Sequence, residues 1–340
     1  MVTPEKPSAQ SEFDDVRELP KRALSTYARL WQLETWLRRM VYVELRALRA
    51  DDWDKGIDAE FPFKADKRLR HMPTPEKDVL SFITFPQLTR LISEHWSAFD
   101  CYLPPQNIWL AKLEEVSQIR NRIAHFRSVH QDDHPRVLQF LRDLDHGFWT
   151  FCTSYNNPQP VLPAANDPVT AHFLSYDPFP WTETSDKKWM RIGHADPSMV
   201  LFVTVEVLRR PWAERKPSAD GAAGYLYYVH IGAREGREFD YARFLDATAN
   251  FHPRLVHICL ENSARSVRLT IPALLGSNVI IGIVQRATEV AGYTVDRGAS
   301  WSLTHRTVQA LADDWPEYVL GPDNPLTFLD PGMPCTFFNA

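Results

Sequence analysis

The sequence of 340 residues has few cysteines and no long apolar run, and both absences limit what the protein can be. The four cysteines lie far apart, without the paired spacing of a zinc ribbon or a redox dithiol: Cys101, Cys152, Cys259 and Cys335. We expect reduced thiols, as in a cytosolic protein. The first residues lack the apolar core of a signal peptide, and no segment approaches the roughly 18 apolar residues of a membrane helix. These absences predict a cytoplasmic protein without a membrane partner.

The chain also has no excess of positive charge. A formal net charge of -5 means that any contact with nucleic acid must come from a local basic patch. We find no internal repeat, no low-complexity tract and no glycine-rich loop that could cradle a phosphate, so no cofactor is predicted. With 44% hydrophobic residues, the chain can bury a sizeable core, and its length predicts about two domains at roughly 150 residues each.

Helical periodicity dominates the first part of the chain. Apolar residues recur at steps near three and four over residues 21–49, and Pro20 suits the start of that helix. Short helices are expected over 76–83 and 86–97. An apolar stripe then marks a helix from about residue 107, and a further helix follows Pro135: Ile108, Leu110, Leu113, Val116, Ile119 and Ile123 form the stripe. We predict an all-α helical bundle over residues 1–157, with tryptophans such as Trp31 and Trp109 in its core.

A segment rich in proline and asparagine, residues 156–168, separates this part from a different pattern. Beyond it the apolar runs are short and β-branched, which predicts strands at 199–208, 225–231, 254–260, 267–271 and 279–284. Short helices are expected at 238–247 and 307–313. The chain is thus predicted to be multidomain, with an α+β domain over residues 168–340 whose sequence does not reveal its role.

One stretch groups residue types that suit chemistry on a phosphodiester. It runs from Gln118 to Arg127 and, from residue 120 onward, contains three arginines, a carboxamide and a histidine: Arg120, Asn121, Arg122, His125 and Arg127. Arginine donates hydrogen bonds to phosphoryl oxygens and keeps its charge, and histidine can take or give a proton near neutral pH. The stretch is therefore the candidate active site.

Helix geometry limits which of these side chains can act together. At about 100° per residue, Arg120 lies roughly 140° around the helix from His125. The two side chains can meet only if the helix ends or bends here, or if a second subunit completes the site at a two-fold axis. A purely structural alternative is a polar helix end in which the arginines pair with Asp132, Asp133 or Glu115 and the histidine caps the helix.

The segment Arg120-Asn121-Arg122-Ile123-Ala124-His125 resembles the R-x(4-6)-H signature, in its R-N-x-x-A-H form, of HEPN domains, the higher eukaryote and prokaryote nucleotide-binding family. The similarity extends to the long leading helix, the motif-bearing helix and the closing helix, and so covers the N-terminal half only. In this family, active members are metal-independent ribonucleases that work as dimers. Many are toxins or abortive-infection effectors in antiviral defence.

This resemblance implies that His125 is the general acid or base, that Arg120 stabilises the transition state and that Asn121 orients them. Arg122 and Arg127 are expected to bind RNA. The implied reaction uses the ribose 2′-hydroxyl as nucleophile, so it needs no metal and leaves a 2′,3′-cyclic phosphate. A homodimer through the motif-bearing helix is expected, together with an antitoxin or trigger protein. Where one HEPN branch carries a tyrosine for adenylylation by its antitoxin, this chain has Arg127, which does not favour that control.

Two other functions stay open at this point. The helical domain could be a catalytically inactive HEPN fold that serves as a binding or scaffold protein. Alternatively, His125, His130 and His134 lie within ten residues, beside Asp132 and Asp133, and could hold the metal of a hydrolase. Their spacing matches no familiar zinc pattern, and Asp133-His134-Pro135 also suits a helix start.

Overall fold

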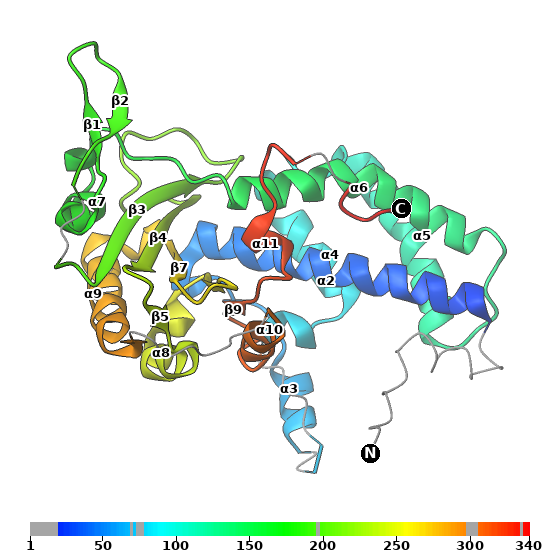
Figure 1. The fold of residues 1–340 in the computed structure, drawn as a ribbon. Helices are drawn as coiled ribbons and strands as arrows, with labels where there is room; N and C mark the ends of the chain where they lie inside the picture. Colours follow the sequence, from blue (N-terminus) through cyan, green and yellow to red (C-terminus); the bar gives the residue numbers. More distant parts are fainter. Residues whose placement is uncertain (1–19, 69–70, 73–77, 195–197, 297–304, 334–335) are drawn as a thin grey trace. The chain divides into compact units, whose positions relative to one another are not determined.

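The structure, a computed structural model, describes residues 20–68, 71–72, 78–194, 198–296, 305–333 and 336–340 (Figure 1). Its α-helices are α2 (Lys21–Arg49), α3 (Glu60–Lys67), α4 (Phe85–Glu94), α5 (Gln106–Ala124), α6 (Asp133–Tyr155), α7 (Pro168–Phe173), α8 (Tyr241–Thr248), α9 (Ser277–Thr294), α10 (His305–Asp313) and α11 (Pro325–Phe328). Its strands are β1 (Trp181–Glu183), β2 (Trp189–Arg191), β3 (Leu201–Arg209), β4 (Tyr225–Ala233), β5 (Glu238–Phe239), β6 (His257–Leu260), β7 (Ser266–Pro272), β8 (Val295–Asp296) and β9 (Val319–Leu320). Within these ranges, no helix is long and apolar enough to cross a membrane.

The order of the elements follows the predicted fold class. Helices α2 to α6 come first, and every strand in the described part of the chain lies after them, mixed with shorter helices. The prediction of a multidomain chain, with an N-terminal helical part and a C-terminal α+β part, is therefore confirmed. The helix expected at 86–97 is α4, and the one at 76–83 falls partly outside the described residues, with a 3₁₀ turn at Val79–Phe82.

By its contacts, the chain divides into two compact units that do not follow the sequence order. Of the residues that the structure describes, unit 1 comprises those within 20–37, 103–146 and 336–340, and unit 2 comprises those within 38–102 and 147–333. The division thus passes through α2 and α6. The predicted boundary at residues 158–167 lies between α6 and α7, where helices give way to strands along the sequence.

Unit 1 is built on the first part of α2, on α5 and on the first part of α6. The side chains buried in it recur at helical spacing: Leu30, Leu33 and Leu37 on α2, Trp109, Leu113, Val116 and Ile119 on α5, and Val137, Phe140, Leu141 and Leu144 on α6. The Trp109 and Phe140 rings lie 5.6 Å apart. Trp109 is therefore a core residue as predicted, whereas Trp31 is 61% exposed and Ile108 and Leu110 also face solvent, so these assignments were wrong. The buried stripe of α5 starts at Trp109, one position away from the predicted one.

The C-terminal residues belong to unit 1, which the sequence did not predict. The Phe338 amide donates a hydrogen bond to Asp145 Oδ1 at 2.7 Å, and Arg29 Nη1 donates to the Phe338 carbonyl at 2.7 Å. The rings of Trp36 and Phe337 meet edge to face at 4.7 Å. Residues 336–340 thus hold α2 and α6 through contacts more than 190 residues apart in the sequence.

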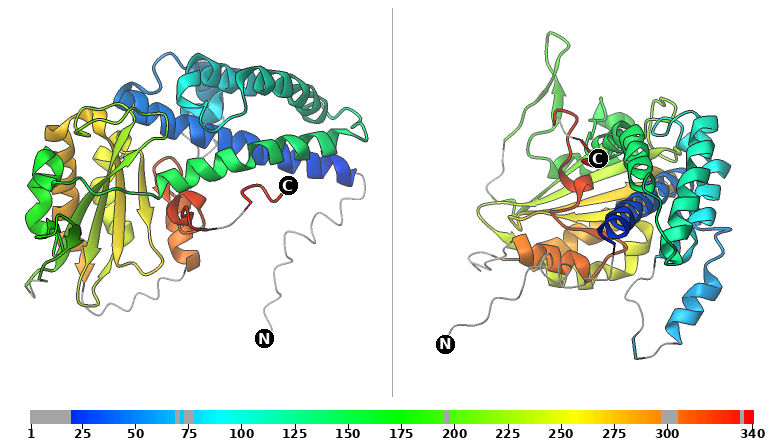
Figure 2. Two further views of the ribbon diagram at one scale, coloured as in Figure 1. Left: turned by 90° about the horizontal axis from the view of Figure 1, so that it is seen from above. Right: turned by 90° about the vertical axis from the view of Figure 1, so that its right-hand side faces the viewer.

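Unit 2 contains a five-stranded sheet in the order β3-β4-β7-β6-β9. All neighbouring pairs are antiparallel except β6 and β9, which run parallel. Helices α8 and α9 lie side by side against one face of the sheet, and the β1–β2 hairpin extends away from it (Figures 1 and 2). The buried apolar side chains of β3, β4 and β7 alternate along each strand, so most of them lie on one face of the sheet.

One expectation for the C-terminal half was wrong. Residues 279–284, predicted as a strand, lie in α9. A short apolar run does not distinguish a buried strand from a buried helix, and only the later positions Ala287, Val290 and Ala291 extend the helical spacing of its buried face.

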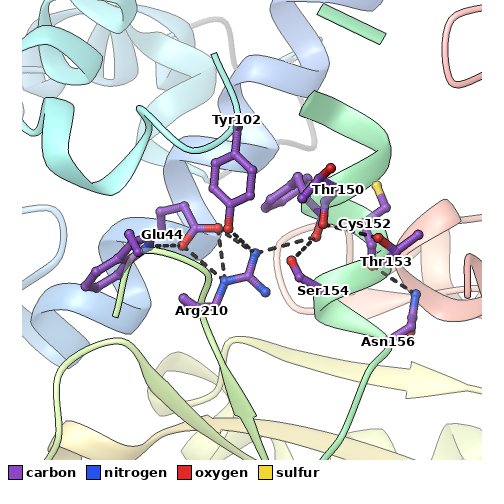
Figure 3. A network of polar contacts seen from close by, with 10 residues as sticks. Glu44, Tyr102, Thr150, Cys152, Thr153, Ser154, Asn156 and Arg210 are labelled. Carbon is purple, nitrogen blue, oxygen red and sulfur yellow. Dashed lines mark hydrogen bonds and ion pairs between the residues drawn. The ribbon is translucent and has the colours of Figure 1, made fainter. Parts of the chain in front are cut away.

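A fully buried ion pair lies within unit 2, between the later part of α2 and the residue after β3. Arg210 Nη2 donates to Glu44 Oε1 at 2.6 Å, and neither side chain is exposed to solvent. Figure 3 shows Arg210 between Glu44 and the Tyr102 hydroxyl, which accepts a second bond at 3.0 Å. Trp212 Nε1 donates to the other carboxylate oxygen at 2.6 Å. Burial acts to lower the pKa of Arg210, but the negative charge of Glu44, the Tyr102 hydroxyl and the hydrogen bonds to both together outweigh it, and the pKa is raised.

This pair makes unit 2 sensitive to the loss of one partner. Glu44→Ala is expected to lower the free energy of unfolding by about 3–5 kcal/mol, because it leaves the Arg210 charge buried and uncompensated. The double variant Glu44→Leu with Arg210→Met should recover much of that loss. Urea unfolding followed by circular dichroism measures both. As a control, Glu94→Ala removes the exposed pair with Arg90 and should change little; equal losses at Glu44 and Glu94 would contradict the prediction.

Two buried histidines lie close together in the sequence, His252 in the 3₁₀ segment Ala249–Arg254 and His257 as the first residue of β6. His252 is 1% exposed, with Nε2 2.9 Å from Thr248 Oγ1 and its ring centroid 5.1 Å from that of Trp315. Burial lowers the pKa of His252 to about 4. His257 is also buried, with Nδ1 2.7 Å from the Tyr155 hydroxyl, and burial lowers its pKa well below the usual value. Both rings are therefore neutral in the folded protein at neutral pH.

Acid should consequently destabilise the fold before the carboxylates titrate. Below about pH 6.5 the unfolded chain takes up protons at these histidines while the folded chain does not, so stability falls as the pH drops. For His252 the loss reaches about 3 kcal/mol near pH 4. His252→Phe keeps a ring against Trp315 and should flatten the dependence of unfolding free energy on pH between 6.5 and 4. Urea titrations at several pH values test this, and an unchanged slope would contradict it.

Candidate functional site

The candidate site lies where α5 ends. Helix α5 runs to Ala124 and His125 is its C-cap residue. Phe126 adopts a left-handed conformation with φ of 53°. Its amide donates to the Ile123 carbonyl at 3.1 Å, and the Arg127 amide donates to the Arg122 carbonyl at 2.8 Å. This pair of bonds is the Schellman motif, which satisfies carbonyls left open at a helix end. The helix thus stops at the motif, which is one of the conditions the sequence set for Arg120 and His125 to meet.

Arg120 lies one turn before the helix end and is oriented by α2. Its Nε donates to Glu34 Oε2 at 3.4 Å, and both side chains are partly buried. A bond of this length is weak, and its main effect is on the direction of the guanidinium. Glu34 was not identified from the sequence, because nothing in the local pattern of α2 relates it to a residue 86 positions later.

Arg122 has a structural partner. Its Nε donates to Asp133 Oδ2 at 3.1 Å and its Nη2 donates to Asp133 Oδ1, so the contact is bidentate. Asp133 is 2% exposed and also accepts the His130 amide at 2.9 Å. The pair joins the end of α5 to the start of α6. One part of the structural alternative is thus observed, since Arg122 pairs with Asp133, while Glu115 pairs with Arg136 instead.

The remaining residues of the motif face solvent. Asn121, His125 and Arg127 are all exposed. Within the described ranges, their side chains make no hydrogen bond or ion pair. His125 therefore does not bond to Arg120 in a single chain. A carboxamide, an imidazole and a guanidinium remain available to a ligand at the end of α5.

The other histidines of this region are engaged with neighbours. His130 Nδ1 accepts the Asp132 amide at 3.2 Å. His134 Nδ1 lies 3.3 Å from Thr26 Oγ1, and burial lowers the pKa of His134. Among the residues that the structure describes, no three histidine, cysteine or acidic side chains are grouped so that they could hold a metal ion. The geometry here gives the metal-hydrolase alternative no ligand set.

Comparison with known families agrees with this geometry. Residues 29–145 match the family model described as Swt1-like HEPN. The match includes most of α2, all of α5 and the first part of α6, and hence Glu34, the Arg120–His125 motif and Asp133. Searches of curated proteins and of solved structures returned no match. HEPN domains are generally associated with ribonuclease activity. The N-terminal half of this chain therefore contains a HEPN domain of the Swt1-like type, with an R-x(4)-H motif at the end of its α5 helix.

Proposed function

We propose that the protein is a metal-independent endoribonuclease that cleaves RNA through the ribose 2′-hydroxyl. The observation that carries this proposal is the exposure of His125 at the end of α5, inside a segment that matches a HEPN family. A ligand can reach its imidazole, and the guanidinium of Arg127 is exposed two residues later. The position combines a proton-transfer group with positive charge, as phosphodiester cleavage requires.

In the proposed reaction, one histidine removes the proton of the 2′-hydroxyl. The 2′-oxygen then attacks the adjacent phosphorus and the bond from phosphorus to the 5′-oxygen breaks. That oxygen takes up a proton, so the products are a 2′,3′-cyclic phosphate and a 5′-hydroxyl. Arg120, oriented by Glu34, would donate to the phosphoryl oxygens as their negative charge increases. Asn121 would orient the phosphate, and Arg127 would bind the RNA backbone. Arg122 would contribute mainly by fixing the helix end through Asp133.

A homodimer would supply what the single chain lacks. Since His125 and Arg120 do not bond to each other, an isologous contact at the end of α5 could place His125 of one subunit beside Arg120 of the other. In each site so formed, the protonated histidine can return its proton to the leaving 5′-oxygen. We therefore propose that the active form is a homodimer through α5. We also propose that the protein is a toxin or antiviral-defence effector. Its α+β part would then respond to a trigger or antitoxin.

Replacing His125 should abolish most of the activity. His125→Ala is expected to slow RNA cleavage by about 10²- to 10⁴-fold, because proton transfer is lost, and to leave thermal stability unchanged, because the side chain is exposed. Arg120→Ala should slow it by about 10²- to 10³-fold. The measurement is incubation of the purified protein with total RNA, with and without EDTA, followed by mapping of the new ends.

The matched control is His130→Ala, which removes another exposed histidine five residues away and should leave cleavage intact. Cyclic phosphate ends that form in EDTA support the proposal. Cleavage that is blocked by EDTA or by His130→Ala would instead favour a metal-dependent hydrolase. No cleavage by the wild-type protein under any condition would favour an inactive HEPN scaffold.

A shared site makes a separate prediction. If Arg120 and His125 act across the dimer, mixed dimers of Arg120→Ala and His125→Ala subunits contain one complete site. Co-expression of differently tagged variants, followed by tandem purification, should therefore restore up to about half of the wild-type activity per dimer. Mixed dimers with no more activity than the two single variants would show that each chain forms its own site.

A further inference from the structure

Phe126 is the most exposed of the large hydrophobic side chains in the described part of the chain. Its side chain is 96% exposed, directly after His125 and before the exposed Arg127. An aromatic ring that is almost fully exposed contributes no stability to the fold through burial. The ring is therefore not held there by packing in unit 1.

The backbone conformation of Phe126 is unusual for a phenylalanine. Its φ of 53° lies in the left-handed region, which is disfavoured for residues with a Cβ atom and is occupied most easily by glycine. The C′ position of a Schellman motif is commonly glycine for this reason. A phenylalanine here is thus less favourable than glycine for the helix end, and its 96% exposed ring gains no compensating burial among the described residues.

The surroundings of the ring suit a nucleobase. Successive Cα atoms are about 3.8 Å apart, so the Phe126 ring begins within one nucleotide of any phosphate bound at His125. Exposed Arg127 on the other side provides positive charge for the backbone. Aromatic rings interleaved with arginines are the arrangement by which proteins bind single-stranded nucleic acid, with each base stacked on a ring.

We propose that Phe126 is the residue on which the protein stacks the base next to the scissile phosphate of a single-stranded RNA. This inference rests on the proposed ribonuclease function and adds a substrate class and a base-binding residue to it. The Schellman motif fixes the backbone on both sides of the ring, so Phe126 is presented at a defined position relative to His125. Stacking is tolerant of sequence, and the proposed contact therefore selects unpaired RNA over duplex RNA.

Phe126→Gly distinguishes this role from a structural one. A stacking role predicts weaker RNA binding with an unchanged or higher melting temperature, whereas a structural role predicts a lower melting temperature. If the ring stacks on RNA, the variant should raise the KM for a short single-stranded RNA by about 5- to 100-fold. Its melting temperature should stay the same or rise slightly, since glycine fits the left-handed position. Phe126→Trp should keep a KM near that of the wild type. Phe61→Ala, which removes an exposed phenylalanine on α3, is the matched control and should change neither quantity.

A set of substrates that each contain one abasic ribonucleotide locates the contact. One abasic position beside the cleaved bond should raise the wild-type KM as much as Phe126→Gly does, and with that substrate the two proteins should become equal. An unchanged KM in Phe126→Gly would overturn the proposal. So would a lower melting temperature or the loss of the dimer in gel filtration, since the ring would then pack against a second copy.

Binding measurements keep this inference distinct from the proposed function. Fluorescence anisotropy with labelled RNA in the His125→Ala background reports stacking without cleavage. If Phe126→Gly weakens binding there but the wild-type protein never cleaves RNA, the ribonuclease proposal fails and the stacking proposal stands. If the wild type cleaves RNA and Phe126→Gly changes neither binding nor KM, the stacking proposal fails alone.

Discussion

The buried pair of Glu44 and Arg210 is the interaction on which the organisation of the chain most depends. Two charges without solvent exposure are tolerated because they pair with each other and also bond to neighbours, Arg210 to Tyr102 and Glu44 to Trp212. Glu44 lies in the segment that matches the HEPN family, whereas Arg210 follows the first long strand of the sheet. Residues assigned to different domains by their sequence patterns thus share one core. Any fragment that contains only one of them would leave a charge buried without its partner.

The candidate site depends on a different feature, which is the way in which helix α5 ends. The Schellman motif stops α5 at His125, and two ion pairs fix the last turn, Arg120 with Glu34 and Arg122 with Asp133. The arginines of the motif therefore do different things. Arg120 is oriented by a weak contact with Glu34, Arg122 pairs with Asp133 at the start of α6, and Arg127 is exposed to solvent. Three residues of one type in one short stretch thus have different surroundings, which only the tertiary contacts distinguish.

This division makes the structural and the functional interpretations of the motif compatible. The pairing of Arg122 with Asp133, expected if the stretch is only a polar helix end, is observed, but it leaves the imidazole and carboxamide exposed. A helix end held in this way keeps its unpaired groups in a defined place. A backbone fixed in this way is what the proposed ribonuclease site would require.

The sequence by itself determined the helical N-terminal part, the α+β C-terminal part and the position of the motif. These features depend on local information: periodicity near 3.6 for α5 and α6, proline and asparagine around residues 156–168, and the types of residue between Arg120 and His125. Only the tertiary structure decided that residues 336–340 contact α2 and α6, that Trp31 faces solvent and that residues 279–284 are helical. It also decided the partners Glu34 and Asp133 and the exposure of Phe126. Each of these depends on which distant segments meet, and no local pattern in the sequence specifies that.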